Sequence, residues 1–87
     1  MKMQTVKLLR RLGQNIRRQR NAANLTQAAL SANARISATH LSAIERGERS
    51  ASVLCLARIA KALQTTTEKL CEGIEDGTRQ KSKSLAQ

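Results

Sequence analysis

The sequence predicts an all-α fold, a compact bundle of four to five short helices, and three observations lead to this prediction. The chain has 87 residues, which allow one domain with a small core. It contains no phenylalanine, tyrosine or tryptophan, so the core must consist of aliphatic side chains, which suit closely packed helices. Its apolar residues recur at spacings of three and four, the period of amphipathic helices.

The first two helices are expected in the N-terminal third of the chain. One apolar stripe predicts a helix from Thr5 to about Arg20. The polar sequence NAAN ends this pattern, and Thr26 can cap the start of a second, shorter helix near residues 26–33. The stripe of the first helix consists of Leu8, Leu9, Leu12 and Ile16.

Three further helices are expected before residue 75. Ser37 can cap a third helix, which Gly47 ends and in which Leu41 and Ile44 face inward. Ser50 or Ser52 can cap a fourth helix, the most hydrophobic of the chain. Its expected inner face consists of Val53, Leu56, Ala57, Ile59, Ala60 and Leu63.

A last turn begins at Thr66 or Thr67, and Leu70 and Ile74 would face inward there. We therefore expect one domain over residues 1–74. Residues 75–87 have almost nothing to bury, and we expect them to form a disordered tail.

The charge of the chain predicts a polyanionic partner. The formal net charge is +10 and the isoelectric point is near 11.2, which favours nucleic acid first and an anionic membrane surface second. No acidic residue precedes Glu45. Four arginines of the first helix could contact a phosphate backbone or only keep a face soluble, and Arg17 is the preferred contact. These four are Arg10, Arg11, Arg17 and Arg18.

The sequence contains no residue pattern that indicates an enzyme, a metal site or a cofactor site. His40 is the single histidine, and Cys55 and Cys71 form no CxxC pair, so a zinc site lacks ligands. Both cysteines are expected as reduced thiols. No catalytic constellation, glycine-rich phosphate loop or cofactor site is visible. No signal peptide or membrane span is visible either, so we expect a cytoplasmic protein without a membrane partner.

The second and third helices form the pattern of a helix-turn-helix, since a tight connection joins them and the second one has small polar residues near its start. Such a helix fits the major groove of double-stranded DNA. Its outer face offers hydroxyl groups for hydrogen bonds and methyl groups for contact with thymine. The candidate base-reading residues are Ala38, Thr39, Ser42 and Ala43.

Residues 12–63, LGQNIRRQRNAANLTQAALSANARISATHLSAIERGERSASVLCLARIAKAL, resemble the lambda-repressor-like (Cro/CI or XRE) helix-turn-helix regulators. The resemblance implies a transcriptional regulator that binds an inverted-repeat operator as a homodimer. It implies a largely buried salt bridge between Arg20 and Glu45. It also implies DNA phosphate contacts by Gln27, Ser37, His40, Arg46 and Arg49.

The chain departs from the family pattern at the turn between the second and third helices. Arg35 stands where glycine is usual, and a left-handed conformation would cost it about 1 kcal/mol. We therefore expect a differently shaped turn. Gln64 likewise replaces the glycine that often follows the fourth helix, and Ala51 replaces a frequent proline.

The sequence leaves alternatives open for the function and for the roles of three residues. The same fold could serve mainly as a protein-binding module, such as an antitoxin with a toxin partner, and phage repressors and restriction-modification controllers also fit the resemblance. A non-specific architectural or membrane-surface protein would rest on charge alone. Leu54 and Cys55 could extend the core face or form a dimer contact. His40 could touch a phosphate or be merely solvated.

Overall fold

The computed structural model describes residues 3–74, and over this range the chain folds into five helices and has no β-strand. The predicted all-α fold class is confirmed. The expected tail, residues 75–87, lies outside the described residues. The helices are α1 (Met3–Ala22), α2 (Gln27–Ala34), α3 (Ala38–Glu45), α4 (Val53–Ala62) and α5 (Thr67–Leu70).

The helices α2 to α5 begin where side-chain oxygens cap them. Each cap accepts a hydrogen bond from the backbone N–H three residues later, at 2.9–3.1 Å, which satisfies a donor that the first turn leaves free. The fourth helix uses Ser52 and the fifth uses Thr66, so the sequence alternatives Ser50 and Thr67 are wrong. The four caps are Thr26, Ser37, Ser52 and Thr66.

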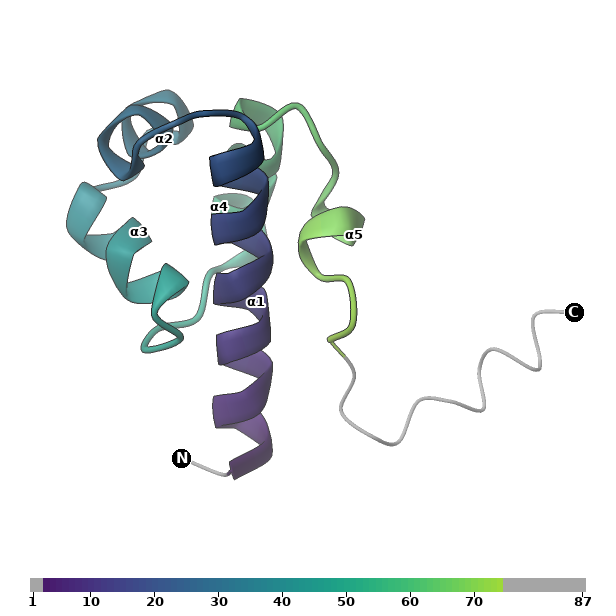
Figure 1. The fold of residues 1–87 in the computed structure, drawn as a ribbon. Helices are drawn as coiled ribbons and strands as arrows, with labels where there is room; N and C mark the ends of the chain where they lie inside the picture. The colour runs from purple at the N-terminus through teal and green to yellow at the C-terminus, as the bar shows by residue number, and fades with distance from the viewer. Residues whose placement is uncertain (1–2, 75–87) are drawn as a thin grey trace, which may run out of the picture.

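The long helix α1 packs against α3 on one side and α5 on the other, while α2 packs against α3 and α4 (Figure 1). Gly13 allows the close approach of α1 and α3, because a Cβ there would overlap the backbone carbonyls of Ile44 and Glu45. This contact fixes the end of α3 against the middle of α1.

The core lies where the five helices meet and is entirely aliphatic apart from one thiol. Cys55 belongs to this core, and burial raises the pKa of its thiol. Cys71 is free and packs against the core from α5. The fully buried large side chains of the core are Ile16, Leu30, Leu41, Ile44, Ile59 and Leu70.

The inner face of α4 differs from the expected one. Cys55 lies four residues before Ile59 and therefore on the same side of the helix. It is buried in the core, so of the two alternatives, core face or dimer contact, it belongs to the core face. Val53 was expected inside, but it stands in the first turn and is 82% exposed. Ala57 is also exposed, and Leu54 is 60% exposed. The inner face is therefore narrower than the hydrophobicity of α4 indicates.

Three residues other than glycine adopt a left-handed conformation at the ends of helices. Arg35 ends α2 with φ 61° and ψ 44°, and its N–H bonds the Ala32 carbonyl. The expectation of a differently shaped turn is thus wrong: the chain keeps the glycine geometry and accepts the strain, about 1 kcal/mol. Gln64 (φ 57°) and Asn24 (φ 59°) end α4 and α1 in the same way.

Candidate nucleic-acid interface

The exposed side of α3 is the candidate base-reading surface. Leu41 and Ile44 are buried and hold the helix to the domain, while Ala38 and Thr39 point to solvent from its first turn. Ser42 is half-buried one turn later. A short helix with small polar side chains on its free face fits the width of the major groove.

Ala43 does not belong to this surface, although its sequence position suggested that it did. Its exposed fraction is only 7%, and its carbonyl oxygen accepts the N–H of Glu48 at 2.9 Å. The loop after α3 therefore folds back beside this residue. Of the four base-reading candidates, three remain accessible: Ala38, Thr39 and, in part, Ser42.

Glu45, the last residue of α3, has a carboxylate that three other side chains approach. Its carboxylate is buried and accepts hydrogen bonds from Arg20 Nε at 2.7 Å and Arg20 Nη2 at 3.0 Å. Gln27 Nε2 donates a third bond at 2.9 Å. Arg17 Nε lies 3.6 Å from the same carboxylate and keeps 54% of its side chain exposed. Burial raises the pKa of Glu45, but these donors outweigh burial and lower it overall.

This arrangement defines the roles of the residues around Glu45. The amide of Gln27 is engaged inside the domain, so its side chain is fixed at the start of α2. Arg20 also donates to the Leu25 carbonyl at 2.9 Å and thereby connects α1, the α1–α2 loop and α3. Arg17 keeps its guanidinium partly in solvent. Arg20 is thus structural, whereas Arg17 remains accessible.

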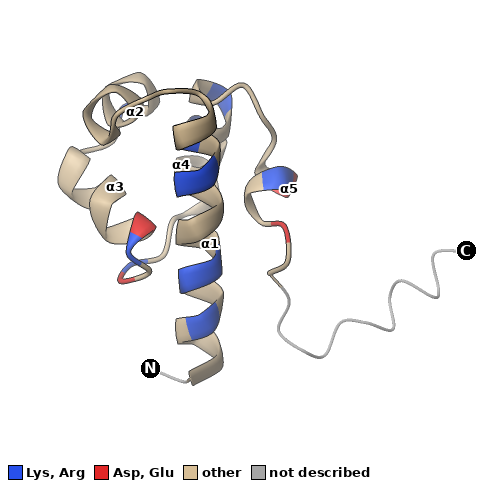
Figure 2. Ribbon diagram, viewed as in Figure 1, with Lys and Arg blue, Asp and Glu red and all other residues tan. Residues whose placement is uncertain are grey.

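A cleft of about 430 Å³ lies between α1 and the end of α3. Three arginines and two glutamates line it, and Arg17 and Arg46 each lie within ion-pair distance of one of these glutamates. Figure 2 shows the Lys and Arg positions along α1. The cleft could not be predicted from the sequence, because residues of α1 and of the α3–α4 loop build it together. Its lining residues are Arg10, Gln14, Arg17, Glu45, Arg46 and Glu48.

Four of the five arginines of α1 form two pairs, and the members of each pair are seven residues apart. Arg10 and Arg17 line the cleft beside α3. Arg11 and Arg18 lie on the α5 side, where Arg11 Nε donates to the Glu72 carbonyl at 3.2 Å and Arg18 Nη2 donates to Asn15 Oδ1 at 3.4 Å. Two complete helical turns, about seven residues, return to the same face, which explains the pairing.

Arg46 directly follows α3, and its side chain points back along that helix toward Ser42. Its guanidinium donates to the Ser42 hydroxyl and, at 3.0 Å, to Glu48 Oε1. The hydrogen bond that Arg46 donates to Glu48 raises the pKa of Arg46, which is cationic at any physiological pH. Arg49 is exposed in the loop that follows. Arg46 thus lies next to the free side of α3.

Ser37 and His40 flank the start of α3. The Ser37 hydroxyl accepts the His40 N–H at 2.9 Å, so Ser37 acts as the helix cap and its oxygen is already engaged. His40 is half-buried. Helix starts favour anions because their first N–H groups are free, and this position suits a phosphate beside the groove.

Asn15 is a buried polar residue that the sequence analysis overlooked. Its Nδ2 donates to the carbonyls of Leu70 and Glu72, both at 2.8 Å, and ties the end of α5 to α1. A signal existed in the sequence, since Asn15 stands three residues after Leu12 and next to Ile16 on the apolar stripe. A polar residue inside such a stripe requires buried partners.

Comparison with known proteins agrees with the fold and the position of α2 and α3. A helix-turn-helix family model matches residues 16–70. A comparison with curated protein sequences gives no significant match. None of the helices within residues 3–74 has the length and hydrophobicity that crossing a membrane requires.

Two solved structures are similar to the chain. The restriction-modification controller protein C.AhdI from Aeromonas hydrophila is 29% identical, with a TM-score of 0.70 over 71% of this chain and 94% of the controller. The clp gene regulator ClgR from Corynebacterium glutamicum is 27% identical, with a TM-score of 0.72 over 91% of this chain and 86% of the regulator. With more than half of its length matched by the family model, the chain belongs to the helix-turn-helix family.

Proposed function

We propose that this DNA-binding transcriptional regulator recognises an inverted-repeat operator as a homodimer and places α3 of each subunit in the major groove. The observation that carries this proposal is the position of the exposed side of α3 beside a cleft lined by three arginines. Base edges are read by small groups on a helix, and phosphates are held by cations next to it. Both components lie together on one side of this domain.

Thr39 and Ala38 are the main base-reading residues in this proposal. The Thr39 hydroxyl can donate or accept a hydrogen bond, and the methyl groups of both residues can contact thymine. Ser42 contributes less, because its hydroxyl already accepts a hydrogen bond from Arg46. No side chain on this face offers a bidentate base contact, so part of the recognition would come from DNA shape.

Affinity would come from cations that surround α3. Arg10, Arg17 and Arg46 in the cleft and Arg49 in the loop can each neutralise a phosphate. The start of α3, with Ser37 and His40, and the fixed side chain of Gln27 would position the phosphate backbone further. These contacts are independent of base sequence.

A homodimer is supported by exposed apolar side chains at the start of α4. Leu54 is 60% exposed and Val53 is 82% exposed on consecutive positions. Their exposure suits contact with a second subunit, because contacts between two copies bury apolar surface. The two similar structures are both of regulators, which agrees with a role in transcription.

A binding screen of genomic fragments at moderate salt tests this proposal. It predicts a preferred fragment that binds at least about 10³ times more tightly than random duplexes. Equal affinity for every duplex would exclude a specific operator. A protein-binding module of the same fold, such as an antitoxin, would instead select no preferred fragment in this screen when it is tested without a partner. Such a module would be purified together with its protein partner.

A further inference from the structure

A second cavity lies between the end of α2 and the middle of α4. Its volume is about 400 Å³, which falls within the range of roughly 300–1,000 Å³ for small-molecule sites. The small side chains of Ala34 and Ala62 leave the space open between the two helices. None of its lining residues is a candidate for DNA contact. They are Asn33, Ala34, Arg35, Arg58, Lys61 and Ala62.

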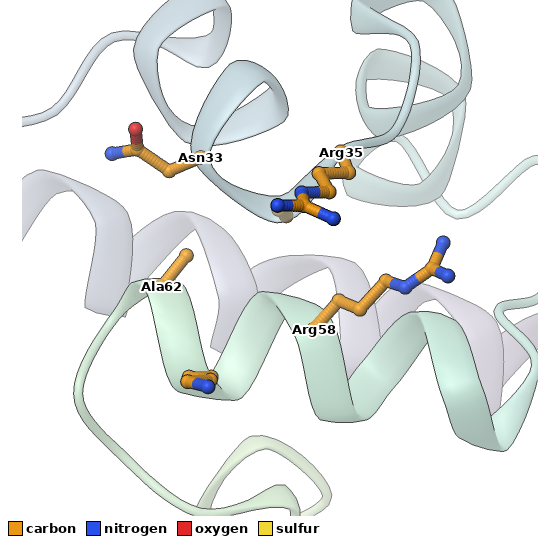
Figure 3. Close-up of a pocket in the computed structure, with 6 residues that line it drawn as sticks. Asn33, Arg35, Arg58 and Ala62 are labelled. Atoms are coloured by element: carbon orange, nitrogen blue, oxygen red, sulfur yellow. The ribbon is translucent and has the colours of Figure 1, made fainter.

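Three of the six lining residues are cationic, and no lining residue is acidic. Figure 3 shows the Arg35 side chain at the end of α2 and the Arg58 side chain rising from α4, with their guanidinium groups directed to different sides of the space between the two helices. Within residues 3–74, none of the three cations forms an ion pair with a carboxylate. Cations that line one cavity without a counter-charge repel one another, and an anion among them relieves that repulsion.

The backbone at Arg35 adds an independent observation. This residue holds a left-handed conformation, with φ 61°, in which glycine would be free of strain. The chain therefore places an arginine at a position where a side chain destabilises the turn, as it places Gln64 and Asn24 after α4 and α1. Residues kept in strained conformations occur preferentially at functional positions. Here the strained residue lines the cavity.

The cavity faces away from α1. In Figure 3, α4 lies in front of α1, whereas α1 lies in front of α4 in the view of Figure 1. The arginine cleft beside α3, by contrast, uses residues of α1. The two basic sites thus share no residue and open on different sides of the domain.

We propose that this cavity binds a small anion with several phosphate groups, of the size and charge of tripolyphosphate. Arg35 and Arg58 would each offer a planar set of N–H donors that matches phosphate oxygens, and Lys61 would add a third positive charge. Asn33 also lines the cavity, and its amide points away from Arg35 and Arg58 in Figure 3. The site would give the regulator a ligand other than DNA.

Titration of the full chain with tripolyphosphate, followed by calorimetry and by amide chemical shifts, tests this site. We expect saturable binding of one anion per chain, with the largest shifts at the end of α2 and in the middle of α4. Arg58→Gln should weaken binding at least about tenfold, because a charged hydrogen bond is lost. Lys7→Gln, which removes one charge from an exposed position of α1, should change it less than twofold.

Arg35→Gly separates binding from folding. Glycine removes the strain of the turn and the guanidinium together, so thermal stability should rise while tripolyphosphate affinity falls about tenfold. A variant that merely fails to fold cannot give this combination. Unchanged affinity in Arg35→Gly, or equal loss in Arg58→Gln and Lys7→Gln, would overturn the proposal.

Competition with duplex DNA distinguishes a free anion from the phosphate backbone. If the site takes a small anion, Arg58→Gln should leave affinity for a 20-base-pair duplex within about twofold, apart from the general effect of net charge. If Arg58→Gln lost as much affinity for the duplex as Arg46→Gln does, the cavity would bind the DNA backbone, and the proposal would be overturned.

Discussion

Arg20 of α1 and Glu45 of α3 form a two-bond ion pair whose carboxylate is buried and whose N···O distances are 2.7 and 3.0 Å. The pair joins the long helix to the end of the helix that faces DNA in our proposal. Gln27 and Arg17 approach the same carboxylate. The orientation of α3 against the rest of the domain therefore depends on one buried acid.

Replacement of Arg20 by methionine should destabilise the domain strongly. Glu45 would keep its buried charge but lose its main partner, which typically costs about 3–5 kcal/mol. Urea unfolding followed by circular dichroism measures the change. Lys7→Met, the same kind of change at an exposed position, should alter the free energy of unfolding by less than about 0.5 kcal/mol. Equal effects of the two variants would show that the pair does not stabilise α3.

Glu45 should also make stability depend on pH. Its pKa in the folded state lies below the usual value of about 4.5, because the bonds from Arg20 and Gln27 outweigh the effect of burial. The carboxylate therefore stabilises the fold fully above pH 4.5, and this contribution is lost as the pH falls through the lower, folded pKa. Urea unfolding from pH 7 to pH 2.5 should show that wild type and Glu45→Gln converge in acid. A constant difference across the range would contradict this prediction.

Asn15→Asp should detach the end of α5. The change keeps the shape of the side chain but replaces the Nδ2 donor with an oxygen that faces the Leu70 and Glu72 carbonyls. We expect a loss of about 2 kcal/mol or more, together with faster amide exchange in α5. Gln14→Glu introduces the same charge at the neighbouring exposed position. If Gln14→Glu destabilised the domain as much as Asn15→Asp does, the added charge, and not the loss of the Asn15 hydrogen bonds, would explain the destabilisation.

Thr39→Ala and Arg46→Gln should affect DNA binding in different ways. Loss of the Thr39 hydroxyl should weaken binding to some base sequences by about 1–3 kcal/mol and leave others unchanged. Loss of the Arg46 charge should weaken binding to all sequences and reduce the salt slope by about one. Fluorescence anisotropy with a panel of duplexes at several salt concentrations measures both. A uniform effect of Thr39→Ala would show that α3 is oriented differently on DNA.

Leu54→Ser should weaken the homodimer and leave the monomer folded. Leu54 is 60% exposed, so the fold loses little, whereas an interface would lose a buried leucine, worth about 1.5–3 kcal/mol. Sedimentation equilibrium gives the dimer dissociation constant. Met3→Ser removes another exposed apolar side chain, at the start of α1, and should not change that constant. If Leu54→Ser dimerised as well as wild type, the interface would lie elsewhere.

The positions of the helices could be predicted from the sequence because their signals are local. The caps Thr26 and Ser37 and the apolar spacing of Leu41 and Ile44 lie within single helices, and the structure places α2 and α3 accordingly. The geometry at the end of α2 could not be predicted, because Arg35 adopts a left-handed conformation that residues other than glycine rarely adopt. Local propensity predicts a different turn there.

The candidate site was only partly predictable, because contacts between distant segments shape it. Ala43 follows the helical period of the exposed face, but it is buried in the folded domain. Val53 has the composition of a core residue, but no element within residues 3–74 covers the first turn of α4. The arginine cleft likewise arises only when α1 and the end of α3 are brought together. Such features depend on packing, which the local pattern does not contain.

Selection of binding sites from random duplex DNA tests the central claim most directly, namely that two copies of α3 read the two halves of one operator. We expect an enriched inverted repeat whose half-sites are centred about one helical turn, roughly 34 Å, apart. Enriched half-sites without symmetry would contradict the dimer, and the absence of any enriched sequence would contradict base reading by Thr39 and its neighbours.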